Sequence, residues 1–353
     1  MKPDLKLNFE RKLASFKLSV QLSVHAEVLV LFGPSGSGKT QTLNSIAGLV
    51  EPDEGEIVFD QTTFSRKTAG QARVSLPARS RRVGYVFQNY ALFPHLTALQ
   101  NIEFPLRKRG EARTRARDLL SKMHLEDLAG RYPHELSGGQ QQRVAIARSL
   151  AADSRLLLLD EPFSALDSFI RERLHDELRS LQSESDLVVI YVTHNLDDAL
   201  AVGNRLAIMR EGRIEQAGDI ETVLDHPANR SVLEILGLPN ILGTSVTGHN
   251  DSLTTLDWNG LSLHIPHCEA SPGTTMTAFI SPNEIRIATA GQNHPNRFNG
   301  TVIRKQFGRM ATRVIVRLEN GCEIEVVPAS NIPTIGENIS VAFPVERIRM
   351  LEG

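Results

Sequence analysis

Residues 33 to 40 form a glycine-rich run that could hold phosphate groups. They read Gly-Pro-Ser-Gly-Ser-Gly-Lys-Thr, which matches the pattern G-x-x-x-x-G-K-[ST]. The glycines let backbone N–H groups converge on an anion, Lys39 can pair with the β- and γ-phosphate oxygens, and the Thr40 hydroxyl can ligate Mg²⁺. The predicted phosphate-binding residues are Gly33, Pro34, Ser35, Gly36, Ser37, Gly38, Lys39, Thr40 and Gln41.

Two carboxylates follow a run of four leucines. Leu156 to Leu159 predict a buried strand, and Asp160 and Glu161 come directly after it. Folds of the α/β class place their chemistry at the carboxyl ends of such strands. We expect Asp160 to hold the magnesium ion and Glu161 to orient and deprotonate the attacking water. Alone, the string could end a core strand and start a turn, but beside the phosphate loop the catalytic interpretation is preferred.

A second helix start could also meet an anion. Ser137 and Gln140 have the S-x-x-Q spacing of a capping box, and Gly138 and Gly139 lie between them. An S-x-x-Q string alone fits an ordinary capped helix. The positive end of the helix dipole, with two glycines beside it, suits a phosphate. One chain would then have two helix starts that can bind an anion. A single nucleotide could contact both kinds of helix start only if they came from two different chains.

The order of these motifs resembles the ATP-binding subunit of an ABC transporter. The matching strings are Walker A at residues 33–40, the glutamine loop at 86–89, the signature at 136–140, Walker B at 156–160, the D-loop at 164–167 and the switch histidine His194. The resemblance implies an ATPase that uses ATP and Mg²⁺ and works as a head-to-tail homodimer. Each ATP would be clamped between the phosphate loop of one chain and the signature of the other.

The resemblance also implies roles for individual residues. Gln88 would contact Mg²⁺ and water and sense a membrane partner, His194 would contact the γ-phosphate, and Asp167 would shape the dimer seam. The expected catalytic residues are Glu161, His194, Lys39 and Gln88; the expected metal ligands are Thr40, Gln88 and Asp160; the expected nucleotide contacts outside Walker A are Ser137, Gly138, Gly139, Gln140 and Asp167. The family usually stacks adenine on an upstream aromatic residue. Phe9 and Phe16 are candidates, but neither has the usual spacing and both fit strand residues that pack a core, so the stacking residue stays open.

Composition limits the function classes. A length of 353 residues allows two domains, and a net charge of −2 gives no bulk field that would attract nucleic acid. Cys268 and Cys322 lie far apart without metal-ligand spacing, which fits a reducing compartment. No apolar run approaches the ~20 residues of a membrane span. We therefore expect a soluble chain. The resemblance implies a peripheral subunit on the cytoplasmic face of the plasma membrane, where another subunit supplies the pore.

The patterning along the chain predicts two domains. Residues 1–237 fit an α/β P-loop nucleotide-binding domain, with antiparallel strands before residue 28 and a helical subdomain at about 89–151. Residues 240–353 lose helical periodicity and show short alternating runs between turns such as Asn320-Gly321. This part predicts a small all-β domain, a barrel of the OB-like type. The resemblance implies a domain of the TOBE type with a regulatory or dimerisation role.

Two short strings in the all-β part resemble the regulatory domain of importer ATPases for oxyanions. Residues 297–302 look like the opening of a molybdate-binding repeat, and residues 280–285 like a strand end of such domains, although Ser281 stands where an arginine is common. A barrel that only dimerises the subunits is the alternative. We expect import of molybdate, with sulfate, thiosulfate or tungstate as alternatives. Residues near Gln88 to His95 would contact the permease subunits, and an extracytoplasmic anion-binding protein would deliver the cargo.

An ABC ATPase without a transport role is the alternative of another class. Such proteins usually carry two nucleotide domains or a long coiled coil. This chain has a single phosphate loop and no sustained heptad pattern, which favours the transporter subunit.

Overall fold

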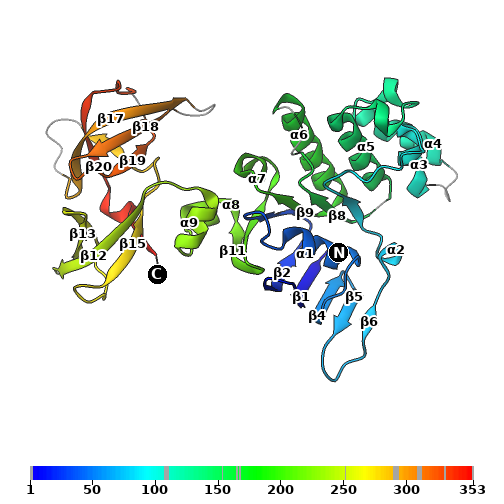
Figure 1. The fold of residues 1–353 in the computed structure, drawn as a ribbon, viewed down its shortest axis with the longest axis horizontal. Coiled ribbons are helices and arrows are strands. Elements are labelled where there is room, and N and C mark those ends of the chain that lie inside the picture. Colours follow the sequence, from blue (N-terminus) through cyan, green and yellow to red (C-terminus); the bar gives the residue numbers. More distant parts are fainter. Residues whose placement is uncertain are drawn as a thin grey trace. The chain divides into compact units, whose positions relative to one another are not determined.

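The computed structural model describes residues 3–106, 111–152, 154–163, 166, 168–250, 252–288, 294–307, 312–329 and 331–351. The chain divides into two compact units, Met1–Ile220 and Glu221–Gly353 (Figure 1). The fold class expected from the sequence is confirmed, because an α/β nucleotide-binding unit is followed by all-β sheets. The domain boundary expected between residues 237 and 240 stays a prediction.

The central sheet of the first unit positions the candidate site. Its strands are, in spatial order, β11 (Arg213–Asp219), β10 (Arg205–Arg210), β3 (Val28–Phe32), β9 (Val188–Thr193), β8 (Leu156–Asp160) and β7 (Gly84–Val86). All neighbours are parallel except β10 and β11. β3, β8 and β9 are buried along their whole length, as continuous apolar runs in a covered parallel sheet should be. Because these strands run parallel, the loops that follow them meet at one edge.

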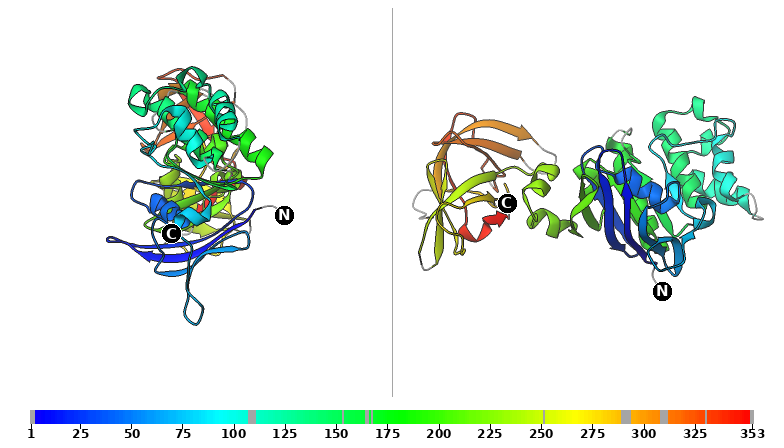
Figure 2. Two further views of the ribbon diagram at one scale, coloured as in Figure 1. Left: turned by 90° about the vertical axis from the view of Figure 1, so that its right-hand side faces the viewer. Right: turned by 60° about the horizontal axis from the view of Figure 1, so that its bottom comes forward.

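An antiparallel sheet lies on the other side of the first helix. Its order is β2 (Lys17–Val24), β1 (Leu5–Lys12), β4 (Glu54–Phe59), β5 (Thr62–Lys67) and β6 (Val74–Ser75). β1 and β2 alternate buried with more exposed residues, as the sequence predicts. Leu43 and Ile46 of α1 (Lys39–Ala47) join one hydrophobic core with side chains of both sheets. In Figure 2 the blue strands and the blue helix accordingly lie next to each other.

A group of helices is inserted between β7 and β8. It contains α3 (Ala98–Glu103), α4 (Ala112–Lys122) and α5 (Gly138–Ala151), which lie together in Figure 1, and the 3₁₀ turns Phe104–Leu106, Glu126–Leu128 and Pro133–Glu135. The short α2 (Ala78–Arg81) comes before β7, while α6 (Ser168–Ser185) and α7 (Leu196–Val202) follow β8 and β9. Thr97 and Gln100 form a capping box at the start of α3. In the described part of the chain no helix is both long and apolar enough to cross a membrane.

The second unit contains two sheets with the same strand order, built from two repeats of the chain. After α8 (Ile220–Asp225) and α9 (Arg230–Leu236), one sheet has the order β14 (Leu261–Pro266), β13 (Leu253–Trp258), β12 (Ile241–His249), β15 (Thr275–Phe279), β21 (Arg349–Leu351). The other has the order β19 (Glu323–Val326), β18 (Thr312–Leu318), β17 (Arg297–Phe307), β20 (Asn338–Ala342), β16 (Arg286–Ala288). The order is the same, and the short end strands β16 and β21 are exchanged. One apolar core joins both sheets.

A buried asparagine precedes the first strand of each repeat. The Asn240 side chain makes two hydrogen bonds with the backbone of Glu325. Its Nδ2 donates to the Glu325 carbonyl oxygen at 2.8 Å, and its Oδ1 accepts from the Glu325 N–H at 2.7 Å. Asn296 makes the same exchange with His264, at 2.7 and 2.6 Å. Each asparagine therefore ties its own repeat to the third strand of the other one. The all-β domain expected from the sequence is confirmed. The structure adds that two interlocked sheets form it, a duplication that the strand pattern alone does not reveal.

Candidate nucleotide-binding and hydrolysis site

The phosphate loop runs from the end of β3 into α1. Gly36 and Gly38 have φ values of 81° and 109°, a region that side chains with a Cβ rarely adopt. A Cβ added at Gly33 would lie 2.1 Å from the carbonyl oxygen of Met209. The glycines are thus required by backbone conformation at two positions and by close packing at the third. The chain between them stays free to turn N–H groups toward an anion.

Lys39 lies inside this loop. Its side chain is buried, with 6% of the residue exposed, and Nζ donates to the carbonyl oxygens of Gly33 and Pro34, both at 2.8 Å. Burial lowers the pKa of Lys39, and the carboxylates of Glu161 and Asp160 counteract part of that shift. The ammonium group is therefore held by the loop itself, in a place where phosphate oxygens can replace the two carbonyls as acceptors.

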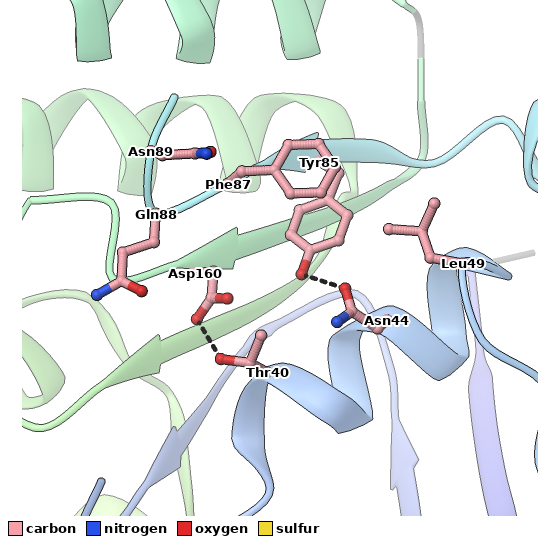
Figure 3. A pocket seen from close by; sticks show the side chains of 8 residues that line it. All are labelled: Thr40, Asn44, Leu49, Tyr85, Phe87, Gln88, Asn89 and Asp160. Carbon is pink, nitrogen blue, oxygen red and sulfur yellow. Dashed lines mark hydrogen bonds between the residues drawn. The ribbon is translucent and has the colours of Figure 1, made fainter. Parts of the chain in front are cut away.

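The three side chains predicted to bind the metal line one cavity beside the loop. Thr40 Oγ1 donates to Asp160 Oδ1 at 3.2 Å, and Gln88 lies across the same cavity of about 490 Å³ (Figure 3). Burial raises the pKa of Asp160, while the Thr40 hydrogen bond acts in the opposite direction. A hydroxyl, a carboxylate and an amide oxygen are the hard ligands that Mg²⁺ takes. The donor set therefore fits the magnesium ion that the sequence predicts.

The second carboxylate meets the histidine that follows β9. Glu161 Oε1 and His194 Nδ1 are 2.8 Å apart, and the histidine side chain is 58% exposed against 17% for the glutamate. Glu161 has a left-handed backbone with φ 47°, and its N–H donates to the carbonyl oxygen of Val192 at 3.0 Å. Backbone strain of this kind gathers at functional sites. The pair can hold a water molecule and accept its proton.

The signature segment forms the capping box that its spacing predicts. The Gln140 N–H donates to Ser137 Oγ at 3.3 Å, and the Ser137 N–H donates to Gln140 Oε1 at 2.9 Å. Gly138 is the first residue of α5. A Cβ on Gly139 would lie 2.6 Å from a methyl group of Leu166, the described residue of the D-loop. The glycine thus permits close packing between the signature and that loop.

Gln41 and Asp167 are the two predicted nucleotide contacts outside the arrangement described above. Gln41 Oε1 accepts from the Arg11 guanidinium at 2.6 Å, so its side chain is turned toward β1. Asp167 lies outside the described residues.

The two aromatic candidates for adenine stacking differ in exposure. Phe9 is 1% exposed and belongs to the core, so it cannot present a ring face to a base. Phe16 is partly exposed, and its ring is 3.5 Å from the place where a Cβ of Gly38 would be. Phe16 therefore lies at the phosphate loop, although it is distant in sequence.

The turn between β10 and β11 is a support of the loop that sequence reasoning missed. The Gly212 N–H donates to the Ser37 carbonyl oxygen at 2.9 Å, and the Gly212 carbonyl oxygen accepts from the Ser19 N–H at 2.7 Å. A Cβ on Gly212, where φ is 80°, would lie 2.5 Å from the Phe16 ring. The dipeptide Glu211-Gly212 signals a turn. Only the fold shows that this turn reaches the phosphate loop.

Comparison with known proteins agrees with this geometry. The ABC transporter family profile matches residues 17–164. The spermidine/putrescine import ATP-binding protein PotA of Nitrosomonas europaea is 37% identical over 335 residues, covering 92% of this chain and 90% of that protein. The Fe(3+) ions import ATP-binding protein FbpC of Brucella abortus is 35% identical over 353 residues, covering 98% and 96%.

A further relative and two solved structures match a smaller share of the chain. The sulfate/thiosulfate import ATP-binding protein CysA of Bradyrhizobium diazoefficiens is 47% identical over 241 residues, covering 65% of this chain and 67% of that protein. Two dimeric structures of the ATP-binding cassette MJ0796, one of them bound to ADP and Pi, are 35% identical with TM-scores of 0.53 and 0.54, each covering 62% of this chain and 98% of the cassette. The chain therefore belongs to the ABC transporter ATP-binding proteins and is an ATP-hydrolysing enzyme of that family.

Proposed function

We propose that this chain is the ATPase subunit of an importer that carries an oxyanion, with molybdate as the first choice, through a partner membrane permease. The observation that carries the proposal is the cavity of Figure 3, where candidate magnesium ligands and apolar side chains line the same hollow. Leu49 there is 51% exposed, and the rings of Tyr85 and Phe87 stack at 4.0 Å. Exposed apolar groups beside a catalytic centre suit a protein partner that controls it.

The proposed chemistry is attack of water on the γ-phosphorus, which breaks its bond to the β–γ bridging oxygen and releases ADP and inorganic phosphate. Lys39 binds the β- and γ-phosphate oxygens. Thr40, Asp160 and Gln88 would hold Mg²⁺, which would neutralise charge on those oxygens. Glu161 accepts the proton of the attacking water, and His194 fixes the orientation of that glutamate through its 2.8 Å contact.

The base and the neighbouring loop complete the nucleotide site. We assign adenine stacking to the partly exposed Phe16, since aromatic faces bind bases without regard to sequence. The other predicted Walker A residues contribute backbone N–H groups from the glycine-rich loop. Gln41 contributes by its place in the first turn of α1, because its side chain is held by Arg11.

A homodimer would complete each site. In the proposal, Ser137, Gly138, Gly139 and Gln140 of one chain contact the nucleotide held by the phosphate loop of the other, and Asp167 shapes the seam between them. The start of α5 supplies the positive end of a helix dipole for this purpose. The dimeric state of the two similar cassettes supports this arrangement.

The permease would dock at residues 88–95 beside the apolar side of the cavity. This places the chain on the cytoplasmic face of the plasma membrane as a peripheral subunit, with an extracytoplasmic binding protein that delivers the anion. The import proteins among the relatives support this assignment of partners. Nucleic acid is not expected as a partner, because the net charge is −2.

The choice of cargo rests on the second unit. Each of its two repeats begins at a buried asparagine. Residues 297–302, which resemble the opening of a molybdate-binding repeat, lie in β17, the first strand of the second repeat. We assign this unit a regulatory role, with dimerisation as the alternative. Sulfate or thiosulfate is the second candidate cargo, favoured by the relative that is 47% identical over 241 residues.

Uptake by whole cells tests the proposal. Cells that lack the gene should lose high-affinity uptake of labelled molybdate, and the intact gene should restore it. A gene encoding Lys39→Ala should not restore it, which shows that uptake depends on ATP bound by this chain. Loss of sulfate uptake alone would move the assignment to the second cargo, and unchanged uptake of every anion would refute import of oxyanions.

A further inference from the structure

The segment after Gln88 contains two consecutive residues in an unusual conformation. Tyr90 and Ala91 have φ values of 61° and 43°, in the left-handed region that residues other than glycine and asparagine seldom enter. Local turns accompany this shape, since the Tyr90 N–H donates to the Phe87 carbonyl oxygen at 2.9 Å and the Ala91 N–H to the Asn89 carbonyl oxygen at 2.7 Å. Such a conformation persists only where surrounding contacts enforce it.

One arginine supplies these contacts. From α5, the Arg148 guanidinium donates through Nη2 to the Tyr90 carbonyl oxygen at 3.0 Å and through Nη1 to the Ala91 carbonyl oxygen at 2.7 Å. The same group lies over the Phe93 ring, 5.4 Å from its centroid. A planar fork of donors suits two successive carbonyls and one aromatic face together. Arg148 therefore holds the strained part of the segment in place.

The helix that carries Arg148 begins at the signature. Ser137 is its N-cap and Gly138 its first residue. A Cβ placed on Gly138 would be 3.9 Å from the Tyr90 hydroxyl, so the Tyr90 side chain reaches back to the helix start. The segment thus approaches α5 at its first turn through the Tyr90 side chain and near its last turn through Arg148.

A second anchor fixes the other end of the segment. Asn101 of α3 is 0% exposed. Its Oδ1 accepts from the Phe93 N–H at 2.9 Å, and its Nδ2 donates to the carbonyl oxygens of Leu96 and Thr97, both at 3.0 Å. A fully buried amide whose bonding groups are satisfied rigidifies its surroundings. The segment is thus hydrogen-bonded to both α3 and α5.

We propose that Arg148 is a positioning residue that makes the segment 88–95 and the signature helix move as one body. Contact of a permease with this segment then displaces Ser137 to Gly139, which serve the nucleotide of the other chain. The inference rests on the proposed function, since it takes residues 88–95 as the docking segment. It adds the side chain that carries the signal and the direction in which it travels, from the permease to the signature.

Lysine in place of Arg148 tests the link, because an ammonium group keeps the charge but cannot span two carbonyls and cover a ring. Arg143→Lys is the matched control: Arg143 lies on the same helix, and its Nη1 donates to the Met123 carbonyl oxygen at 2.8 Å, away from the segment. ATP turnover is measured for each isolated chain and again after assembly with the permease in liposomes. The isolated Arg148→Lys chain should hydrolyse ATP at the rate of the isolated parent chain. The factor by which the permease raises that rate should be at least about fivefold smaller than for the parent chain, the effect of one lost hydrogen bond.

Equal stimulation of Arg148→Lys and the parent chain would overturn the inference and leave the proposed function standing. A parent chain that shows no permease stimulation would overturn both. Equal loss in Arg148→Lys and Arg143→Lys would also refute the inference, because it would reflect general loosening of α5.

Amide hydrogen exchange gives a readout that does not need the permease. In a Glu161→Gln background, ATP should slow exchange both at residues 137–141 and at residues 88–95, since the two parts move together. With Arg148→Lys added, ATP should still protect residues 137–141 but no longer residues 88–95. Retained protection of residues 88–95 would contradict the proposed link.

Discussion

Replacement of Phe16 by alanine should weaken ATP binding and leave phosphate binding intact. The ring is partly exposed at the phosphate loop, next to Gly38 and Gly212, where the base of a nucleotide bound at α1 can lie over it. Stacking of a base on an aromatic side chain contributes about 1–3 kcal/mol, so ATP should bind about 5- to 150-fold more weakly. Phe16→Tyr keeps the ring and should bind ATP as the parent chain does.

Calorimetric titration distinguishes stacking from a general effect on the loop. ATP and inorganic tripolyphosphate are titrated into the parent chain, Phe16→Ala and Phe16→Tyr. Tripolyphosphate has no base, so its affinity should be the same for all three chains. Equal weakening of both ligands by Phe16→Ala would show that the ring only shapes the phosphate loop. Unchanged ATP affinity would refute the assignment of Phe16 to adenine.

Three further changes test the scaffold and the dimer. The Arg81 guanidinium donates to three carbonyl oxygens, two of them at the end of α1, so Arg81→Met should lower the free energy of unfolding by about 2–4 kcal/mol in urea, unlike the exposed Arg82→Met. Burial lowers the pKa of His175 from 6.5 to about 4. Between these values the unfolded chain binds a proton that the folded chain does not, so stability should fall as pH falls, and His175→Gln should flatten that slope in urea titrations at stepped pH. Mixed dimers of Lys39→Ala and Gly139→Asp chains should trap one nucleotide, because one site is intact and the other lacks both elements; two equal weakened sites would speak against sites shared between chains.

Local sequence signals predicted the parts of the site that depend on near neighbours. The glycine pattern defines the phosphate loop because conformation and close packing there exclude other side chains. The leucine run before Asp160 predicts β8 because a covered parallel strand is apolar throughout. The S-x-x-Q spacing predicts the start of α5 because both partners of the box lie within one turn.

The parts that sequence could not predict depend on residues far apart in the chain. Gly212 supports Ser37 across 175 positions, and Arg148 holds Ala91 across 57. Neither contact leaves a periodic or short-range pattern. The exchange of β16 and β21 between the two sheets of the second unit is hidden for the same reason, since strand patterns reveal which residues face a core but not which sheet a strand joins.

The most direct test of the account is steady-state phosphate release by Glu161→Gln. The amide keeps the size of the side chain and removes the group that accepts the proton from water. We predict that ATP binds with unchanged affinity, that turnover falls at least ~10²-fold, the scale of a lost general base, and that dimers accumulate with ATP. Turnover equal to that of the parent chain would contradict the assignment of Glu161 and, with it, the mechanism built on this site.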